Sequence, residues 1–460
     1  MWIPFSAHPD GPLGLSAKQM EGEMGMQKGI ATVLFWLSLS FPWFSAAIAH
    51  DLAPANVSTT SAGWADDPED PPNLLKRIQI RGSQTESLFP VSPLGPLHDG
   101  FGAFKQDFYD ATNIMLGLSF HSAIQGATDV LPGTDDFGGA TDMDFVGTWE
   151  LFNRGEPTQG ELVFGLEGRW EYGPIGPQNI GFGSLGSAGG TANTFSAYTP
   201  AFILRNLYYR QGSPEAGWVF RVGKITPDAI LLTNRHITPN TTFLSNAGTG
   251  VFAGGFPDSG LGIAGNLYIN DNVSLGGVIS DSNANRFNWG DIGTGDFYTA
   301  LELGLNTGPK ADKAGHSKFL IWHTDGTSDG TPINGNTGND GWGYAIVLDH
   351  ELTSDGRAVV VGRYGQSFDK AAIYDQQAAV HFLLYEPFGR FENDVIGAAF
   401  NWVQSAAAGT RDEYNIEAFY RFPLFPHVDT TLSYQSVFNP AFNTAFDHSS
   451  VFSLRVTTSF

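Results

Sequence analysis

The chain has 460 residues, including 57 Gly and 36 Phe, and only 15% of its residues are charged. Its formal charge of −23 argues against nucleic-acid binding, because no basic patch offsets that field. Cys is absent, so neither a disulfide framework nor a thiolate metal site is available. A mean hydropathy of −0.12 excludes a helical membrane bundle but fits a barrel, in which half of each strand faces water.

The N-terminal region carries one long apolar run, over residues 30–49. The run follows Lys28 and ends in Ala-Ile-Ala, and this order of basic, apolar and small residues is typical of a secretory signal peptide. We therefore expect residues 1–49 to be a signal peptide, with translation beginning at Met24 or Met26. An uncleaved membrane anchor is the alternative. Export without Cys indicates the envelope of a Gram-negative bacterium.

Two further segments precede the repetitive part of the chain. Residues 50–96 begin with an acidic, Pro-rich stretch and are predicted to form a mobile leader. Within residues 97–112, Phe101, Phe104 and Phe108 recur at helical spacing. This spacing predicts one short amphipathic helix, which we expect to pack against the following domain.

Residues 113–460 contain sixteen segments in which apolar and polar residues alternate. A strand has a period of two, so each segment has one apolar face and one polar face. Most segments have about the length that a tilted strand needs to cross a bilayer. The last one closes the chain on Phe460, which is typical of outer-membrane barrels, although a soluble sandwich strand can alternate in the same way. The segments begin near Ile114, Asp142, Gly160, Ala201, Gly217, Ser259, Asn272, Gly295, Ser317, Trp342, Arg357, Gln376, Asn393, Arg411, His427 and Ser449.

The connections between these segments alternate between long and short. Short periplasmic turns opposite long external loops are expected of a porin, whereas a soluble sandwich has no reason to sort its loops. The predicted fold is therefore an all-β, 16-stranded antiparallel transmembrane barrel in the outer membrane, with a short N-terminal helix. We expect outer-membrane lipid around it and recognition of Phe460 by the assembly machinery. The long loops are 126–141, 173–200, 226–258 and 281–294, and the short turns include 153–159, 212–216, 270–271, 353–356 and 423–426.

Signals for catalysis and metal binding are weak. None of the 11 His lies in a Gly-x-Ser-x-Gly context or an HExxH pair. His121 shares a predicted lumen face with Ser119, but histidines are common in polar lumens. The acidic stretches 135–144 and 325–340 lack the spaced ligand order of a calcium loop and are interpreted as solvated loop acids. We therefore predict a protein that is not an enzyme and has no metal or cofactor.

Alternation places several charged residues on the lumen face. Arg169, Arg205 and Arg221 are expected at similar depth beside Glu167, with Arg235 joining them from a loop, and these five form the predicted constriction. Arg and carboxylate groups together can bind vicinal hydroxyls, although they can also simply pair across the lumen. Because the predicted lumen carries both positive and negative side chains, it does not fit a filter that selects ions of one sign. Other predicted lumen-facing residues are Glu161, Glu171, Glu417, Arg421 and Arg455.

The loop 226–258 is the longest connection. A wide barrel passes solutes unselectively unless something narrows it, and a loop of this length can fold inward to do so. The sequence leaves open whether this loop lies inside the barrel or above it.

Several stretches carry a resemblance through their order: 207–211, 220–225 and Phe243, and then 417–422, 434–435, 439–440 and 454–460. On these stretches the chain resembles the OprB-type carbohydrate-selective porins over residues 95–460. The resemblance implies a 16-stranded channel through which small carbohydrates, mono- or disaccharides, diffuse into the periplasm. The segment 93–100 departs from the family, and the sugar and the oligomeric state stay open. The alternatives are a channel for organic acids or an exported polysaccharide and, less favoured, a barrel that hydrolyses lipid.

Overall fold

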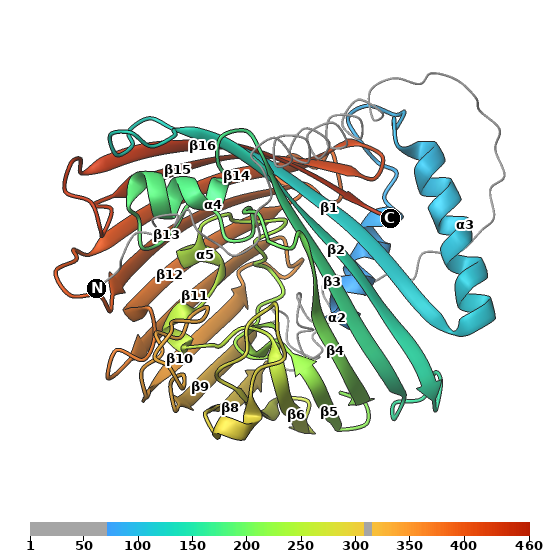
Figure 1. The fold of residues 1–460 in the computed structure, drawn as a ribbon. Coiled ribbons are helices and arrows are strands. Elements are labelled where there is room, and N and C mark those ends of the chain that lie inside the picture. The colour runs from blue at the N-terminus through green and yellow to red at the C-terminus, as the bar shows by residue number, and fades with distance from the viewer. Residues whose placement is uncertain (1–70, 308–314) are drawn as a thin grey trace, which may run out of the picture.

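The computed structural model describes residues 71–307 and 315–460, which form a closed β-barrel with helices at its N-terminal end (Figure 1). Each strand pairs antiparallel with its neighbours in sequence, and β1 closes the barrel by pairing with β16. The predicted fold class is thus confirmed. The predicted signal peptide lies outside the described residues. The strands are β1 (Ile114–Ala127), β2 (Phe137–Phe152), β3 (Gly160–Tyr172), β4 (Phe202–Ser213), β5 (Trp218–Ile225), β6 (Gly260–Asn270), β7 (Val273–Asp281), β8 (Phe297–Asn306), β9 (Gly315–Thr324), β10 (Gly341–Glu351), β11 (Ala358–Ser367), β12 (Tyr374–Tyr385), β13 (Val395–Ser405), β14 (Glu413–Phe425), β15 (Val428–Phe438) and β16 (His448–Ser459).

The outer surface of the barrel is apolar. In β8 the exposed Leu301 and Leu303 alternate with the buried Ala300 and Glu302, so one face of the strand points outward and the other into the barrel. Such a surface suits hydrocarbon, and closure leaves no unpaired sheet edge in it. Other outward residues of the same kind are Ile263, Leu267, Ile279, Ile321, Phe400, Ile416, Leu432 and Phe452.

Two helices precede the barrel. Helix α2 (Pro71–Gly82) lies inside it against β1, β2, β3 and β16, and buries Leu75 and Ile78 (Figure 1). The leader predicted over residues 50–96 is therefore wrong for this segment, because its apolar side chains find partners on the barrel wall. Helix α3 (Gly95–Thr112) lies beside the start of β1 and contains the predicted 97–112 helix. Within the described residues, no helix is long and apolar enough to cross a membrane.

The longest connection, L3 (226–259), folds into the barrel. Its Leu231 and Phe243 are at most 1% exposed and join a hydrophobic cluster with inward residues of the wall. The Glu417 carboxylate accepts the backbone N–H groups of Leu244 (2.6 Å) and Ser245 (3.1 Å). A buried loop must have such partners, because its polar backbone groups are removed from water.

The second long connection, L2 (173–201), also turns inward. The Glu413 carboxylate of β14 accepts hydrogen bonds from the backbone N–H groups of Ala188 (2.8 Å) and Gly189 (3.0 Å). L2 thus reaches from β3 across the barrel to β14. L2 and L3 thus occupy part of the lumen, and one of the remaining cavities lies beside β2, β3 and β4.

Candidate functional site

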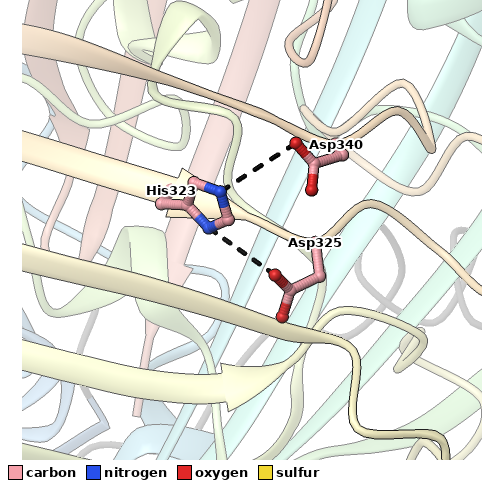
Figure 2. Close-up of side chains that lie close together, drawn as sticks. All are labelled: His323, Asp325 and Asp340. Atoms are coloured by element: carbon pink, nitrogen blue, oxygen red, sulfur yellow. Dashed lines mark ion pairs between the residues drawn. The ribbon is translucent and has the colours of Figure 1, made fainter.

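Three exposed side chains come together on the outer face, at the loop end of β9 (Figure 2). His323 Nδ1 lies 3.7 Å from a carboxylate oxygen of Asp325, and its Nε2 lies 4.0 Å from one of Asp340. A metal ion takes one nitrogen of an imidazole, whereas here the two nitrogens face different carboxylates. The arrangement is that of two solvent-exposed ion pairs, formed when His323 is protonated.

Ser119 and His121 lie on the lumen face of β1 and are nearly fully buried. His121 Nε2 is 3.1 Å from Ser119 Oγ, and the Asp144 carboxylate lies 3.6 Å from this same nitrogen. His121 Nδ1 instead contacts the Thr457 hydroxyl at 3.1 Å. A hydrolase triad needs its acid on the imidazole nitrogen that does not face the serine. The pair therefore lacks the geometry of an activated nucleophile.

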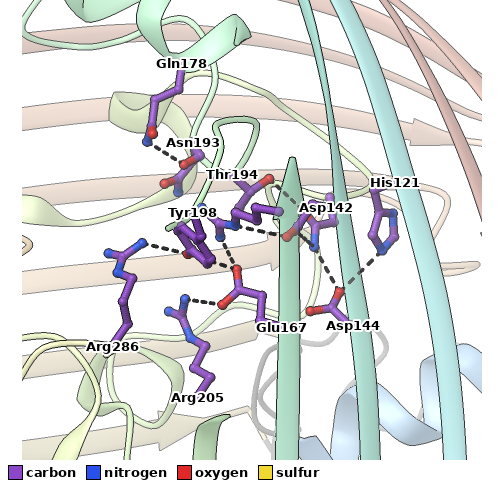
Figure 3. A network of polar contacts seen from close by, with 12 residues as sticks. His121, Asp142, Asp144, Glu167, Gln178, Asn193, Thr194, Tyr198, Arg205 and Arg286 are labelled. Atoms are coloured by element: carbon purple, nitrogen blue, oxygen red, sulfur yellow. Dashed lines mark hydrogen bonds and ion pairs between the residues drawn. The ribbon is translucent and has the colours of Figure 1, made fainter. Parts of the chain in front are cut away.

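Two cavities inside the barrel share part of their lining. The vestibule on the loop side has a volume of about 290 Å³, and the inner cavity above α2 has about 100 Å³. Both are lined by Arg169, Thr194, Arg205 and Pro239. We call this shared wall, with the polar network around it in Figure 3, the constriction.

The centre of the constriction is the Glu167 carboxylate on β3. It pairs with Arg169 on the same strand and accepts a hydrogen bond from Arg205 Nη1 at 2.8 Å. Arg169 Nε also donates to Asp142 on β2 at 3.0 Å. Asp142 and Arg169 are cross-strand partners, so strand register brings these charges together.

A β-bulge aims Arg205 at this centre. The pairing of β3 with β4 shifts between Gly165 and Leu166, and Arg205 is the extra residue on β4. Its side chain is 25% exposed, whereas that of Arg169 is 5% exposed. Arg205 is therefore the more accessible of the two guanidinium groups for a solute in the cavities.

Loop residues complete the network. Tyr198 of L2 donates its hydroxyl proton to Glu167 (3.2 Å), and Arg286 of L4 (282–296) donates to the same hydroxyl (2.7 Å). The guanidinium groups of Arg169 and Arg286 lie 4.7 Å and 5.2 Å from the Tyr198 ring centre. Burial raises the pKa of Tyr198, so the phenol stays protonated and remains a donor.

The remaining loop contacts join L2 and L3 to the wall (Figure 3). Asn240 of L3 donates to Asp142 (3.2 Å) and Asp144 (3.4 Å) and accepts from Thr194 of L2 (2.8 Å). Asp258, at the end of L3, accepts from Arg286 Nε at 2.5 Å. Burial raises the pKa of Asp258, but the guanidinium groups of Arg286 and Arg205 outweigh it and lower this pKa below its usual value.

The structure brings three of the five predicted constriction residues together: Arg169, Arg205 and Glu167. Arg221 is not at their depth, because it lies opposite Arg210 in the sheet and donates to Asn266 at 3.0 Å. Arg235 lies elsewhere in L3, where its Nη2 is 3.1 Å from the Glu351 carboxylate of β10. The prediction of one depth for all the arginines is therefore wrong, since strand tilt and the bulge offset neighbouring strands.

The other predicted lumen residues do point inward, and their side chains bind other residues of the protein. Glu161 pairs with Arg210 at 2.7 Å, and Glu171 accepts from Asn179 and from the backbone of Ala197, both of L2. Glu417 binds L3 as described above. Arg421 donates to the Thr241 carbonyl (3.0 Å), and Arg455 donates to those of Pro239 (2.8 Å) and Thr242 (2.7 Å).

Four residues of the constriction were not predicted from the sequence: Asp142, Tyr198, Asn240 and Arg286. Asp142 was assigned to a solvated loop, which is wrong because β2 begins earlier, at Phe137, and this carboxylate is 0% exposed. Alternation extended backward along β2 would have found it. The other three lie on loops, where no periodicity places a side chain.

A closed barrel of sixteen antiparallel strands, narrowed by loops that fold inward, defines a porin-type protein. Residues 244–460 match the family model described as "Carbohydrate-selective porin, OprB family". The resemblance of the sequence to OprB-type carbohydrate-selective porins is thereby confirmed. No curated protein matches the sequence.

Solved structures with the same fold include Pseudomonas putida OprB. Its high-pH structure matches with a TM-score of 0.64 at 13% identity, over 82% of this chain and 99% of that one. Its low-pH structure matches with a TM-score of 0.49 at 12% identity, over 78% and 96%. A mutant of the Rh. blastica porin has a TM-score of 0.44 at 14% identity, over 75% and 100%.

Proposed function

We propose that this protein is a channel in the outer membrane of a Gram-negative bacterium. Mono- and disaccharides diffuse through it into the periplasm, with no covalent step and no energy coupling. The observation that carries this proposal is the constriction, in which Arg205 and Arg286 flank Tyr198 and Glu167 between two cavities. Guanidinium forks and carboxylates bind vicinal hydroxyls, and an aromatic ring offers an apolar face to a pyranose.

The balance of charge at the constriction favours neutral solutes. Guanidinium and carboxylate groups alternate around it, so an organic anion meets repulsion there as well as attraction. A sugar can donate to the carboxylates and accept from the guanidinium groups. The groups concerned are Arg169, Arg205, Arg286, Asp142, Glu167 and Asp258.

Replacement of Arg205 tests the proposal. In planar bilayers, Arg205→Ala should weaken the block of ion current by sugar about tenfold, the value of one charge-assisted hydrogen bond. The open conductance should stay the same or rise, because Glu167 keeps Arg169 and Tyr198 as partners. Arg390→Ala, in the exposed turn between β12 and β13, is the matched control. Sugar should block its ion current as strongly as that of the wild type. Unchanged block in Arg205→Ala would remove Arg205 from the sugar path.

Liposome swelling distinguishes the solute classes. We expect faster swelling with mono- and disaccharides than with organic anions of similar size. Preferential uptake of organic anions, together with an anion-selective reversal potential, would favour the other-solute channel instead. Hydrolysis of phospholipid by the purified protein would contradict a purely passive channel.

A further inference from the structure

A second polar recess opens beside the vestibule, where the end of L3 meets L4 and L5 (325–340). Its volume is about 510 Å³, within the range of pockets that hold small ligands. It shares Arg286 and Asn334 with the lining of the vestibule, so the two spaces adjoin. The rest of its lining includes Asn283, Asn285, Phe287, Asn288, Ser328, Asp329 and Thr331.

A tight turn in L4 fixes the wall of this recess. The side-chain oxygen of Asn285 accepts from the backbone N–H of Phe287 at 2.9 Å. The side-chain oxygen of Asn288 accepts from the backbone N–H groups of Asn285 (3.0 Å) and Gly290 (3.1 Å). Neither side-chain nitrogen makes a hydrogen bond within the described ranges 71–307 and 315–460. The turn therefore orders two amides while leaving their N–H donors available to a ligand.

The same turn presents an aromatic ring. Phe287 is 51% exposed, and its ring meets the Tyr198 ring edge-on, with 5.7 Å between the centroids. A phenyl ring held at the rim of a polar recess is unfavourable in water unless something covers it. On L5, Ser328 and Asp329 also line the recess. The Ser328 hydroxyl donates to the Asn283 side-chain oxygen at 3.0 Å, and the Asp329 carboxylate accepts from the backbone N–H of Thr331 at 2.9 Å and keeps further acceptor capacity.

We propose that this recess is an outer sugar subsite, which a sugar occupies before it reaches the constriction. The Phe287 ring covers the apolar face of a pyranose, and Asn285, Asn288 and Asp329 bind its hydroxyls. The inference rests on the proposed function, because it takes the solute to be a carbohydrate. Arg286 connects the two sites, since it lines the recess and donates to Tyr198 in the constriction.

An outer subsite makes sugar capture asymmetric. The recess is built by L3, L4 and L5, which all lie at the same end of the barrel. Sugar arriving from that end meets the recess first, whereas sugar from the opposite end meets α2 and the inner cavity. The subsite therefore raises the rates of sugar entry and of sugar exit through the loop side by the same factor, and it leaves the equilibrium affinity of the constriction unchanged.

Single-channel recording with sugar added to one side at a time tests this inference. A single cysteine placed by D135C in the exposed first loop, in a chain that has none, reports the orientation of the channel through a thiol reagent. We expect Phe287→Ala and Asn285→Ala to lower the association rate from the loop side by roughly three- to tenfold. The association rate from the other side should not change, and the block lifetime should not shorten.

Phe388→Ala is the matched control, because Phe388 is a 66%-exposed ring in the turn at the opposite end of the barrel. It should leave the loop-side rate unchanged, and wild-type ion conductance in every variant shows that the barrel is folded. Equal changes from both sides, or no change from either, would overturn the outer subsite while sugar block of the wild type still supports the channel. If sugar does not block the wild type at all, the proposed function itself is wrong.

Discussion

At the scale of single residues, the constriction is organised around one carboxylate. Glu167 is 4% exposed, forms ion pairs with Arg169 and Arg205, and accepts a hydrogen bond from the Tyr198 hydroxyl. A buried carboxylate is stable only with such partners, and each cation in turn depends on it. Arg169 is also held by Asp142, so Arg205 is the cation that depends most on Glu167.

Removing this charge should change the ion selectivity of the channel. Glu167→Gln keeps the shape of the side chain but leaves the Arg205 guanidinium without its carboxylate. We expect the reversal potential in a KCl gradient to shift toward anion preference. Glu156→Gln is the control, because it removes one negative charge in the exposed turn between β2 and β3, outside the lumen. It should leave the reversal potential unchanged. A wild-type reversal potential in Glu167→Gln would mean that ions pass by another route.

At the scale of elements, α2 is a helix that occupies the lumen. Leu75 and Ile78 pack on Val146 of β2, and a glycine on β1 makes room for them. A Cβ added at Gly117 would lie 2.7 Å from a methyl carbon of Leu75. Because α2 also lines the inner cavity, it narrows the path between the constriction and the end of the barrel opposite the long loops.

Displacing α2 should therefore widen the channel. Ile78→Asp places a carboxylate in an apolar contact, which costs on the order of 3 kcal/mol and should release the helix from the wall. We expect a larger open conductance, measured in planar bilayers. Ile80→Asp makes the same change at a position of α2 that is 40% exposed and should behave like the wild type. Equal conductance in all three proteins would show that α2 does not limit flow.

The strands and helices also differ in how well they could be predicted from the sequence. Strands follow from alternation, which is local, and most of the predicted starts lie within a few residues of the observed ones. The bulge at Arg205 depends on how β4 pairs with β3, so alternation along β4 does not reveal it. Helix α2 had a signal in the spacing of Leu74, Leu75 and Ile78, but the surrounding Pro-rich, acidic residues concealed it.

At the scale of the whole molecule, the contacts that shape the lumen are non-local. Glu417 lies 173 residues from the backbone of L3 that it binds, and Arg455 lies 216 residues from its partner at Pro239. No pattern within one segment reports such a contact. This is why lumen-facing charges could be predicted, whereas their division between the constriction and the anchoring of loops could not.

Helix α3 also contacts the C-terminus of the chain. His98 of α3 stacks on His427, in the turn before β15, with 3.8 Å between ring centroids, and on Phe460 at 4.5 Å. Burial, with the nearby His427, lowers the pKa of His98 to about 4. Lys105 lowers this pKa further, whereas Asp99 raises it. The stack therefore depends on a neutral imidazole.

Acid should accordingly detach α3 from the barrel. A histidine whose pKa is lower in the docked state stabilises docking fully above its free pKa of about 6.5, and this contribution is lost as the pH falls toward 4. We expect hydrogen exchange of residues 95–112, corrected for its intrinsic pH dependence, to accelerate below about pH 5. His98→Phe keeps an aromatic ring on Phe460 without a titrating group and should weaken the pH dependence. If wild type and variant respond alike, acid acts on α3 through other groups, and the His98 stack is not what holds it.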